Sequence, residues 1–365
     1  MMSGFLIIEA MVDVIVIGGG VIGMMTARNL ALRGASVTLI ERGKLGAESS
    51  WAGGGIISAL NPWQATPAIN RLILWGHENY QALAEDLAAK TRLDPEWQRS
   101  GMLFVSGESE LAEKWSFESG IMLEDINGSK LKTLSPELNA DSAIYLPDVA
   151  QIRNPRLAKS LAISLKQLGV QVLENMRVDQ IVVEQGQLKS IQSGKQGFSA
   201  DKVVLAAGAW SAKLVPALAK KRILPVRGEM LLYKLPQGSL KQIIIGPYGY
   251  AIPRKDGHVL YGSTVEDVGF NKATTDGALK ELTVAAEQLL PILNPSALVG
   301  HWAGLRPGSD NGVPVISSAP EIENLFINCG HFRNGIAMAP ASAQLMADLV
   351  EGVKPKIEAD DYALM

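Results

Sequence analysis

The chain has a single cysteine, Cys329, among its 365 residues, so it cannot form an intrachain disulfide. Its four histidines, His77, His258, His301 and His331, are scattered, and no two of them stand at the spacing of metal ligands. We therefore expect neither a disulfide framework nor a metal site.

An excess of charge of one sign is also missing. The 34 basic and 37 acidic residues leave a net charge of −3, aromatic residues make up only 6%, and no basic run exceeds a few residues. Proteins that bind nucleic acids or anionic membranes carry basic patches. We expect neither partner here and predict a small-molecule substrate, while homo-oligomerisation stays open.

The chain has no convincing membrane segment. The charge-free stretch Ser49–Asn70 is interrupted by Pro62, Pro67 and three consecutive glycines, which predicts a buried loop and not a spanning helix. The apolar residues near the amino terminus lack the basic region of a secretory signal, because the first positive charge is Arg28. We expect a cytoplasmic protein, in which residues 1–10 are a frayed or alternative-start extension without a function.

A β-α-β unit follows this extension. Val12–Ile17 is a short β-branched run typical of a strand buried on both faces, Val21–Leu32 predicts a helix that ends before Gly34, and Ser36–Ile40 predicts a second strand. The crossover between parallel strands is right-handed in nearly all proteins. The start of the chain is thus typical of a nucleotide-binding domain.

Later segments divide into two kinds. Asn154-Pro155 predicts a helix start, with Asn154 as N-cap, and apolar residues at helical spacing continue to Gly169. Strands are predicted at Gln171–Leu173, Gln180–Glu184, Leu188–Gln192 and Lys202–Ala206. After Pro225 an antiparallel pattern is predicted, with strands Gly228–Leu235, Gly249–Pro253 and His258–Gly262 and a helix at Asp276–Leu290. The end returns to a strand, Leu325–Asn328, a glycine loop and a helix, Ile336–Val350.

These patterns and the length of the chain predict two domains of the α/β class. A discontinuous Rossmann-like dinucleotide-binding domain is expected at residues 11–90, 147–220 and 300–365. An α+β substrate-binding domain with an antiparallel sheet is expected at residues 91–146 and 221–299.

A glycine motif, Gly18-x-Gly20-x-x-Gly23, lies between the first strand and its helix. Such glycines allow a tight turn, close approach to a pyrophosphate and helix–strand contact, and the helix N-terminus binds the pyrophosphate. Glu41, at the end of the second strand, stands where a carboxylate accepts hydrogen bonds from ribose hydroxyls. We predict a dinucleotide site, which does not separate FAD from NAD or an enzyme from a nucleotide-binding protein.

Four further segments carry a family resemblance: Ser49–Gly55, the run Val203–Ser211, Gly304–Gly308 and Gly330–Gly335. With the β-α-β unit, they resemble the family of flavoproteins that includes glycine oxidase, D-amino acid oxidase and sarcosine oxidase. The resemblance extends over nearly the whole chain, and the last two segments are most similar to glycine oxidases.

The resemblance implies non-covalent FAD. The residues that it places at the cofactor are Gly18, Gly20, Val21, Ile22, Gly23, Glu41, Arg42, Ser49, Ser50, Ala52, Gly53, Gly54, Gly55, Val178, Ala207, Gly208, Trp210, Arg333, Asn334, Gly335 and Ile336. Trp210 by itself is equally compatible with ordinary core packing.

Three residues are expected at the substrate. Arg306 lies between apolar and glycine residues, where a buried guanidinium needs an anion, although a surface ion pair is the usual fate of an arginine. The resemblance assigns the substrate carboxylate to Arg306 and to the hydroxyl of Tyr250, which otherwise is a half-buried packing residue. It places Arg333 beside the flavin, whereas a pairing with nearby acids is the alternative.

No residue is expected to act as a general acid or base. His301 and His331 are candidates by type, but the resembling enzymes need no obvious protein base, and Cys329 is not at the position of a covalent flavin link. The resemblance therefore implies oxidation of glycine, sarcosine, D-alanine and D-proline by dioxygen, with hydrogen peroxide as a product and a role in thiamine thiazole synthesis. A sarcosine or D-amino acid dehydrogenase with another electron acceptor and an NAD-dependent reductase are the alternatives.

Overall fold

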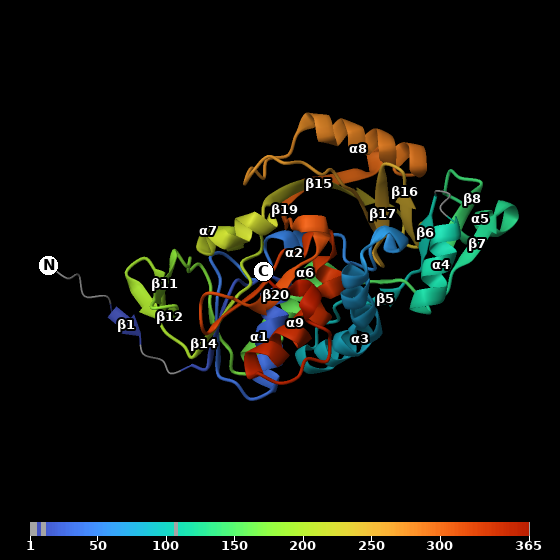
Figure 1. Ribbon diagram of the computed structural model, residues 1–365. Coiled ribbons are helices and arrows are strands. Elements are labelled where there is room, and N and C mark those ends of the chain that lie inside the picture. The colour runs from blue at the N-terminus through green and yellow to red at the C-terminus, as the bar shows by residue number, and fades with distance from the viewer. Residues whose placement is uncertain (1–5, 9–11, 106–108, 365) are drawn as a thin grey trace.

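The computed structural model of the chain describes residues 6–8, 12–105 and 109–364 and forms two large and two small β-sheets (Figure 1). The first large sheet has six strands, in the order β10 (Gln171–Leu173), β3 (Val37–Ile40), β2 (Val14–Ile17), β14 (Lys202–Leu205), β21 (Leu325–Cys329) and β20 (Val315–Ser318). All neighbours are parallel except β20 and β21.

Helices cover one face of this sheet. The residues of β2 are all buried, since Val14 and Val16 pack in a core with four helices and Ile15 and Ile17 pack in a second core on the other face. The four helices are α1 (Val21–Leu32), α3 (Pro67–Thr91), α6 (Asn154–Gln167) and α9 (Gly335–Glu351). The predicted β-α-β unit is therefore confirmed, as is the strand buried on both faces.

The second large sheet is mostly antiparallel and lies beside the first (Figure 1). Its order is β19 (Leu298–Pro307), β15 (Pro225–Lys234), β18 (His258–Gly262), β17 (Gly249–Pro253), β16 (Ile243–Gly246), β6 (Met102–Phe104), β8 (Ser142–Leu146) and β7 (Glu124–Asn127). Helix α8 (Asp276–Leu289) packs on β15, β17 and β18. The predicted antiparallel region after Pro225 is confirmed.

Short elements complete the fold. The small sheets are β4 (Ile56–Ile57), β9 (Ala150–Gln151) and β5 (Gln98–Arg99), and β1 (Leu6–Ile8), β13 (Gln196–Phe198), β12 (Gln187–Ser193) and β11 (Gln180–Glu184). The short helices are α2 (Ser49–Ala52), α4 (Ser109–Ser119), α5 (Gly128–Leu134) and α7 (Ser211–Leu214). The 3₁₀ turns are η1 (Pro62–Gln64), η2 (Gly208–Trp210), η3 (Pro216–Lys221), η4 (Pro295–Ala297), η5 (Asp310–Gly312), η6 (Phe332–Asn334) and η7 (Asp360–Tyr362).

The expected buried loop Ser49–Asn70 is wrong in part. It begins with helix α2 and ends inside α3, a 25-residue helix whose first residue is Pro67. The hydroxyl of Thr66 accepts a hydrogen bond from the backbone N–H of Ile69 and caps this helix. Thr66-Pro67 is therefore a helix start signal that the sequence contained. Within the described ranges, no helix is both long and apolar enough to cross a membrane.

Two smaller expectations also need correction. Asn154 is the first residue of α6 and not its N-cap, because its side chain donates to the carbonyl of Gly53. Leu6–Ile8, expected to be frayed, form strand β1 and pair in parallel with β13. The remainder of the predicted extension lies outside the described residues.

The expected domain limit at residue 300 falls within β19. Because β19 pairs along its length with β15, residues 298–307 belong to the antiparallel sheet. The other proposed limits stay predictions.

Candidate active site

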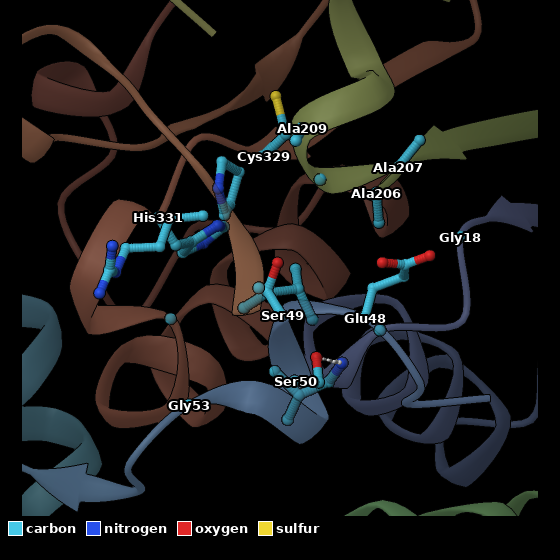
Figure 2. Close-up of a pocket in the computed structure, with 18 of the residues that line it drawn as sticks. Gly18, Glu48, Ser49, Ser50, Gly53, Ala206, Ala207, Ala209, Cys329 and His331 are labelled. Atoms are coloured by element: carbon cyan, nitrogen blue, oxygen red, sulfur yellow. Dashed lines mark hydrogen bonds between the residues drawn. The ribbon is translucent and has the colours of Figure 1, made fainter. Parts of the chain in front are cut away.

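A cavity of about 530 Å³ lies between the two large sheets. Figure 2 looks into it, with Gly18 and Ala206 on one side and His331 on the other. Apart from Gly23, the predicted site residues all line this cavity: Gly18, Gly20, Val21, Ile22, Glu41, Arg42, Ser49, Ser50, Ala52, Gly53, Gly54, Gly55, Val178, Ala207, Gly208, Trp210, Tyr250, Arg306, Arg333, Asn334, Gly335 and Ile336. Tertiary structure thus brings together residues as far apart in the sequence as Gly18 and Ile336.

The glycine motif forms one end of the cavity. Gly18 has a φ of 112°, and a Cβ atom there would lie 2.3 Å from the carbonyl oxygen of Ala206. Gly23 does not line the cavity: a Cβ on it would lie 1.9 Å from the carbonyl oxygen of Gly18, so its role is to let α1 touch the strand. Both glycines are required by close packing.

Glu41 organises the turn beside the motif. One carboxylate oxygen accepts a 2.7 Å hydrogen bond from the N–H of Gly19, and the other accepts a 2.7 Å bond from the N–H of Gly43. Its side chain is mostly buried, yet the residue lines the cavity. Because each carboxylate oxygen has a further lone pair, Glu41 keeps acceptor capacity for a ligand hydroxyl.

This end fits a dinucleotide. Helix α1 starts at the cavity wall and has no acidic residue in its first turn, so the positive end of its dipole is not neutralised. The hydroxyl of Ser50 accepts a 2.8 Å hydrogen bond from the backbone N–H of Val21. A Cβ atom on Gly20 would lie 3.3 Å from the same hydroxyl oxygen, so the space between them is narrow. A narrow glycine-walled space at a helix N-terminus suits a pyrophosphate.

The loop Gly53–Gly55 is held from behind. Its three successive carbonyl oxygens accept hydrogen bonds from the amide of Asn154 (2.9 Å), the guanidinium of Arg254 (2.7 Å) and the N–H of Ile152 (2.9 Å). Sequence analysis missed Arg254. Its position directly after Pro253, the last residue of the strand that bears Tyr250, was the available signal.

Arg254 is buried and has no ion-pair partner among the described residues. Its other bonds go to the side-chain oxygen of Gln151 and the carbonyl of Ile152, and burial lowers the pKa of its guanidinium to about 10. The residue still carries its charge at neutral pH, so it gives strong hydrogen bonds to this loop.

Trp210 lies at the edge of the cavity, where it is not ordinary core. The guanidinium carbon of Arg42 lies 3.4 Å from the centre of its ring, and Phe270 packs at a centroid distance of 5.3 Å. Arg42 also forms an ion pair with Glu48, which Lys272 joins from the segment that bears Phe270. These contacts join the two sheets across the cavity edge.

The opposite end of the cavity is cationic. On β19, Arg306 donates to the carbonyls of Arg227 (3.2 Å) and Thr264 (3.1 Å) and to the hydroxyl of Ser263 (2.5 Å). Its guanidinium occupies the space that a side chain at Gly228 would fill, since a Cβ there would lie 2.1 Å from Nη1. Neutral groups alone therefore hold this cation.

Arg333 lies close to Arg306, and both face the cavity. Arg333 is exposed at the cavity, where partial desolvation lowers its pKa and the positive charge of Arg306 lowers it further. Neither arginine forms an ion pair with any described residue. Two guanidinium groups without a carboxylate partner form a site for a small anion.

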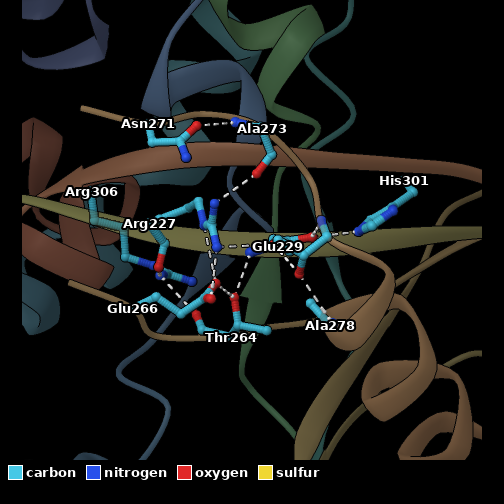
Figure 3. A network of polar contacts seen from close by, with 10 residues as sticks. Arg227, Glu229, Thr264, Glu266, Asn271, Ala273, Ala278, His301 and Arg306 are labelled. Atoms are coloured by element: carbon cyan, nitrogen blue, oxygen red, sulfur yellow. Dashed lines mark hydrogen bonds and ion pairs between the residues drawn. The ribbon is translucent and has the colours of Figure 1, made fainter. Parts of the chain in front are cut away.

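Two carboxylates on the face of the antiparallel sheet that points away from the cavity, those of Glu229 and Glu266, form ion pairs with other residues (Figure 3). Side chains alternate along β15, so Gly228 and Met230 face the cavity while Arg227 and Glu229 face away. Arg227 pairs with Glu266 at 2.8 Å and with Glu229 at 3.5 Å, and Glu229 also contacts His301 at 2.7 Å. The acids are thereby kept from Arg306.

The groups that might transfer protons are inert. Burial lowers the pKa of His331 to about 3, and its Nε2 lies 2.9 Å from the hydroxyl of Ser342. Burial raises the pKa of the Cys329 thiol to about 12. His301 does not line the cavity. An imidazole whose protonated form has a pKa of about 3 is too weak a base to take up a proton at neutral pH, and a protonated thiol is a poor nucleophile.

The glycine cradle, the acid at the end of the second strand and the paired cations are typical of a dinucleotide-binding enzyme with room for a small anion beside the cofactor. Residues 13–349 match the model of the family described as FAD dependent oxidoreductase. The chain belongs to this family, its cofactor is FAD, and the NAD-dependent alternative is excluded.

Individual relatives agree with this assignment. The chain is 42% identical to a glycine oxidase of Pseudomonas putida over 356 residues, which cover 96% of this chain and 98% of that protein. It is 30% identical over 363 residues to the bifunctional protein ThiO/ThiG of a Synechocystis strain, covering 95% of this chain and 53% of that protein. The crystal structure of glycine oxidase from Geobacillus kaustophilus superimposes with a TM-score of 0.89 at 27% identity, covering 97% and 98% of the two chains.

Proposed function

We propose that the protein is a glycine oxidase that converts glycine, water and dioxygen to glyoxylate, ammonia and hydrogen peroxide. The observation that carries the proposal is the pair Arg306 and Arg333, which face the cavity with no carboxylate partner among the described residues. The similarity to glycine oxidases supports it. We also propose sarcosine, D-alanine and D-proline as substrates and, from the family resemblance, a role in thiamine thiazole synthesis in the cytoplasm.

The cofactor end would hold FAD without a covalent bond. The N-terminus of α1 and Gly18–Gly20 would hold the pyrophosphate, Glu41 the ribose, and Ser49–Gly55 the flavin half together with Ala207, Gly208 and the segment Arg333–Ile336. Val178, Arg42 and Trp210 would pack along the cofactor. The thiol of Cys329 does not ionise at neutral pH, which supports the absence of a covalent link.

The substrate end would orient the amino acid by its carboxylate, with the amine neutral. Arg306 would hold the carboxylate bidentately, and Arg333 would add a second charge. Tyr250 would donate from strand β17, which is separated from β19 by β15 and β18 in the same sheet. Bound FAD supplies the redox chemistry, because it takes two electrons from the substrate and passes them to dioxygen. Because the low pKa of His331 makes it a weak base and the Cys329 thiol stays protonated, the protein would contribute orientation and electrostatics and no general base.

If the protein fixes the carboxylate and the flavin fixes the reacting C–H bond, the side chain on the α-carbon of the substrate can point in only one direction. The site is therefore expected to be chiral even though glycine is not, and the family resemblance favours the D configuration. Bulky D-amino acids should react more slowly than glycine.

The test is peroxide release by the purified holoenzyme with glycine, sarcosine, D-proline, both alanine enantiomers and D-phenylalanine. We expect activity with the first three and D-alanine and none with L-alanine. A preference for D-phenylalanine would indicate a general D-amino acid oxidase. Turnover with an artificial electron acceptor but not with dioxygen would identify a dehydrogenase instead.

A further inference from the structure

Ser263 joins the two residues that we assign to the substrate carboxylate. It follows strand β18 and lines the cavity. Its hydroxyl oxygen accepts a hydrogen bond from Nη2 of Arg306 at 2.5 Å and lies 3.2 Å from the hydroxyl of Tyr250. No pattern in the sequence pointed to this serine.

The segment that carries Ser263 is held firmly on strand β15. Arg227 and Glu266 form two backbone hydrogen bonds, of 2.9 and 3.0 Å, in addition to their ion pair. The hydroxyl of Thr264 accepts the N–H of Glu229 at 2.9 Å and donates to Glu266 at 2.8 Å (Figure 3). Ser263 and Thr264 therefore have a fixed position, and both present an oxygen to Arg306.

The hydrogen bonds leave one hydroxyl proton without a strong acceptor. A hydroxyl group has one proton and two acceptor positions. If Tyr250 donates to Ser263, the serine oxygen accepts two bonds and its own proton is free. If Ser263 donates to Tyr250, the tyrosine proton has only the sulfur of Met230 at 3.5 Å, a weak acceptor that a carboxylate would replace. Either arrangement has one proton to offer to the cavity.

An anion is the partner that this proton suits. The two guanidinium groups of Arg306 and Arg333 raise the potential at this end of the cavity, so a negatively charged ligand group is favoured there. A hydroxyl group beside these cations can donate a hydrogen bond to the negatively charged group that the cations bind. Such a bond is stronger than one to a neutral acceptor.

We propose that Ser263 is a further substrate-binding residue, which shares with Tyr250 a single hydroxyl proton that is donated to the substrate carboxylate. The inference rests on the proposed function, in which Arg306 and Tyr250 bind that carboxylate. Its consequence is redundancy: when one hydroxyl is removed, the other still supplies the proton, and the proton is lost only when both are removed.

The experiment measures the dissociation constant of acetate, followed by the absorbance change of the bound flavin, together with KM for glycine. The variants are Ser263→Ala, Tyr250→Phe, the double variant and Ser263→Thr. We expect each single removal to weaken acetate binding about two- to threefold and the double variant about 20-fold or more, which exceeds the product of the single effects. Ser263→Thr keeps the hydroxyl and should stay within about twofold of the wild type.

Ser160→Ala is the matched control, because it removes a buried hydroxyl that bonds only within helix α6. This variant should bind acetate as the wild type does. A double variant whose effect equals the product of the single effects would overturn the shared proton, and an unchanged Ser263→Ala, Tyr250→Phe double variant would remove Ser263 from the site.

Arg306→Ala separates this inference from the function on which it rests. If Arg306→Ala leaves acetate binding unchanged, the carboxylate site itself is wrong. Arg306→Ala could weaken acetate binding while the effect of the double hydroxyl variant equals the product of the two single effects. In that case the proposed function stands and only the role of Ser263 fails.

Discussion

The two ends of the cavity use backbone and side chains in opposite ways. At the flavin end, the side chains of Arg254 and Asn154 lie behind the wall and hold the carbonyls of Gly53 and Gly54. At the substrate end, backbone carbonyls of Arg227 and Thr264 hold the side chain of Arg306, which faces the cavity.

This difference assigns separate consequences to arginines of the same charge. Loss of Arg254 leaves buried carbonyls without donors, so it should damage the fold and the cofactor site. Loss of Arg306 leaves carbonyls beside an open cavity, where water reaches them, so it should damage substrate binding more than stability. Four experiments test or sharpen this comparison.

The largest effect is expected for Arg254→Met. The change removes the donor from the oxygens of Gly54, Gln151 and Ile152, and it should lower the free energy of unfolding by about 3–5 kcal/mol. Urea denaturation and FAD content after purification measure it. Arg222→Met, at an arginine side chain that is 74% exposed, is the control and should cost less than about 0.5 kcal/mol. Equal stability of the two variants would break the comparison.

Arg306→Ala should act on the other end. Losing a charge-assisted carboxylate contact costs about 2–4 kcal/mol, so kcat/KM for glycine should fall by about 30- to 1,000-fold, mainly through KM. Stability to urea should change far less than in Arg254→Met. Arg306→Lys keeps the charge without the bidentate geometry and should be intermediate. Wild-type kcat/KM in Arg306→Ala would refute its role.

Glu41→Ala tests the contact that we propose between the Glu41 carboxylate and the ribose of FAD. It removes the acceptor proposed for the ribose and the bonds to Gly19 and Gly43, so FAD binding should weaken by about 1–3 kcal/mol while the fold persists. Fluorescence titration of the apoprotein with FAD measures this. Glu41→Gln keeps the shape and should lose less. Unchanged affinity in both variants would show that the ribose contact lies elsewhere.

The smallest effect concerns pH and His331. Its folded pKa of about 3 is below the value of 6.5 for a free histidine, so between these values the unfolded chain binds one more proton. This contribution to stability is complete above pH 6.5 and is lost as the pH falls, by about 1.4 kcal/mol between pH 7.5 and 5.5. His331→Gln should reduce the pH dependence of unfolding by one proton. An identical pH dependence in both proteins would mean that His331 titrates normally.

Local patterns predicted the dinucleotide half well. The glycine motif, Glu41 and the helix Val21–Leu32 lie within one β-α-β unit, whose hydrogen bonds and packing depend on neighbours in the sequence. The long helix α3 was not predicted, because prolines occur both in loops and at the first position of a helix, and only Thr66 before Pro67 indicates the helix start. Correct attention to capping would have found it.

The substrate half depended on more distant partners. Arg306 and Tyr250 were selected through the family resemblance, and nothing near Ser263 in the sequence distinguishes it from a surface serine. Its role follows from the placement of β18 and β19 on either side of β15, a pairing that brings residues 43 apart into contact. The role of Arg254 likewise depends on a distant partner, because its guanidinium donates to the carbonyl of Gly54, which lies 200 residues earlier in the sequence.

The sequence by itself determined a βαβ dinucleotide unit with a ribose acid, since the turn, the helix and the acid are set by local sterics and short-range spacing. Only the tertiary structure decided which arginines have a carboxylate partner and which do not. Arg227 and Arg306 lie on neighbouring strands and are chemically identical, but the alternation of side chains places Arg227 beside Glu229 and Glu266. Arg306 instead faces the cavity, where it pairs with none of the described carboxylates. The face of a sheet on which a side chain lies depends on strand register, and register is set by contacts between segments far apart in the chain.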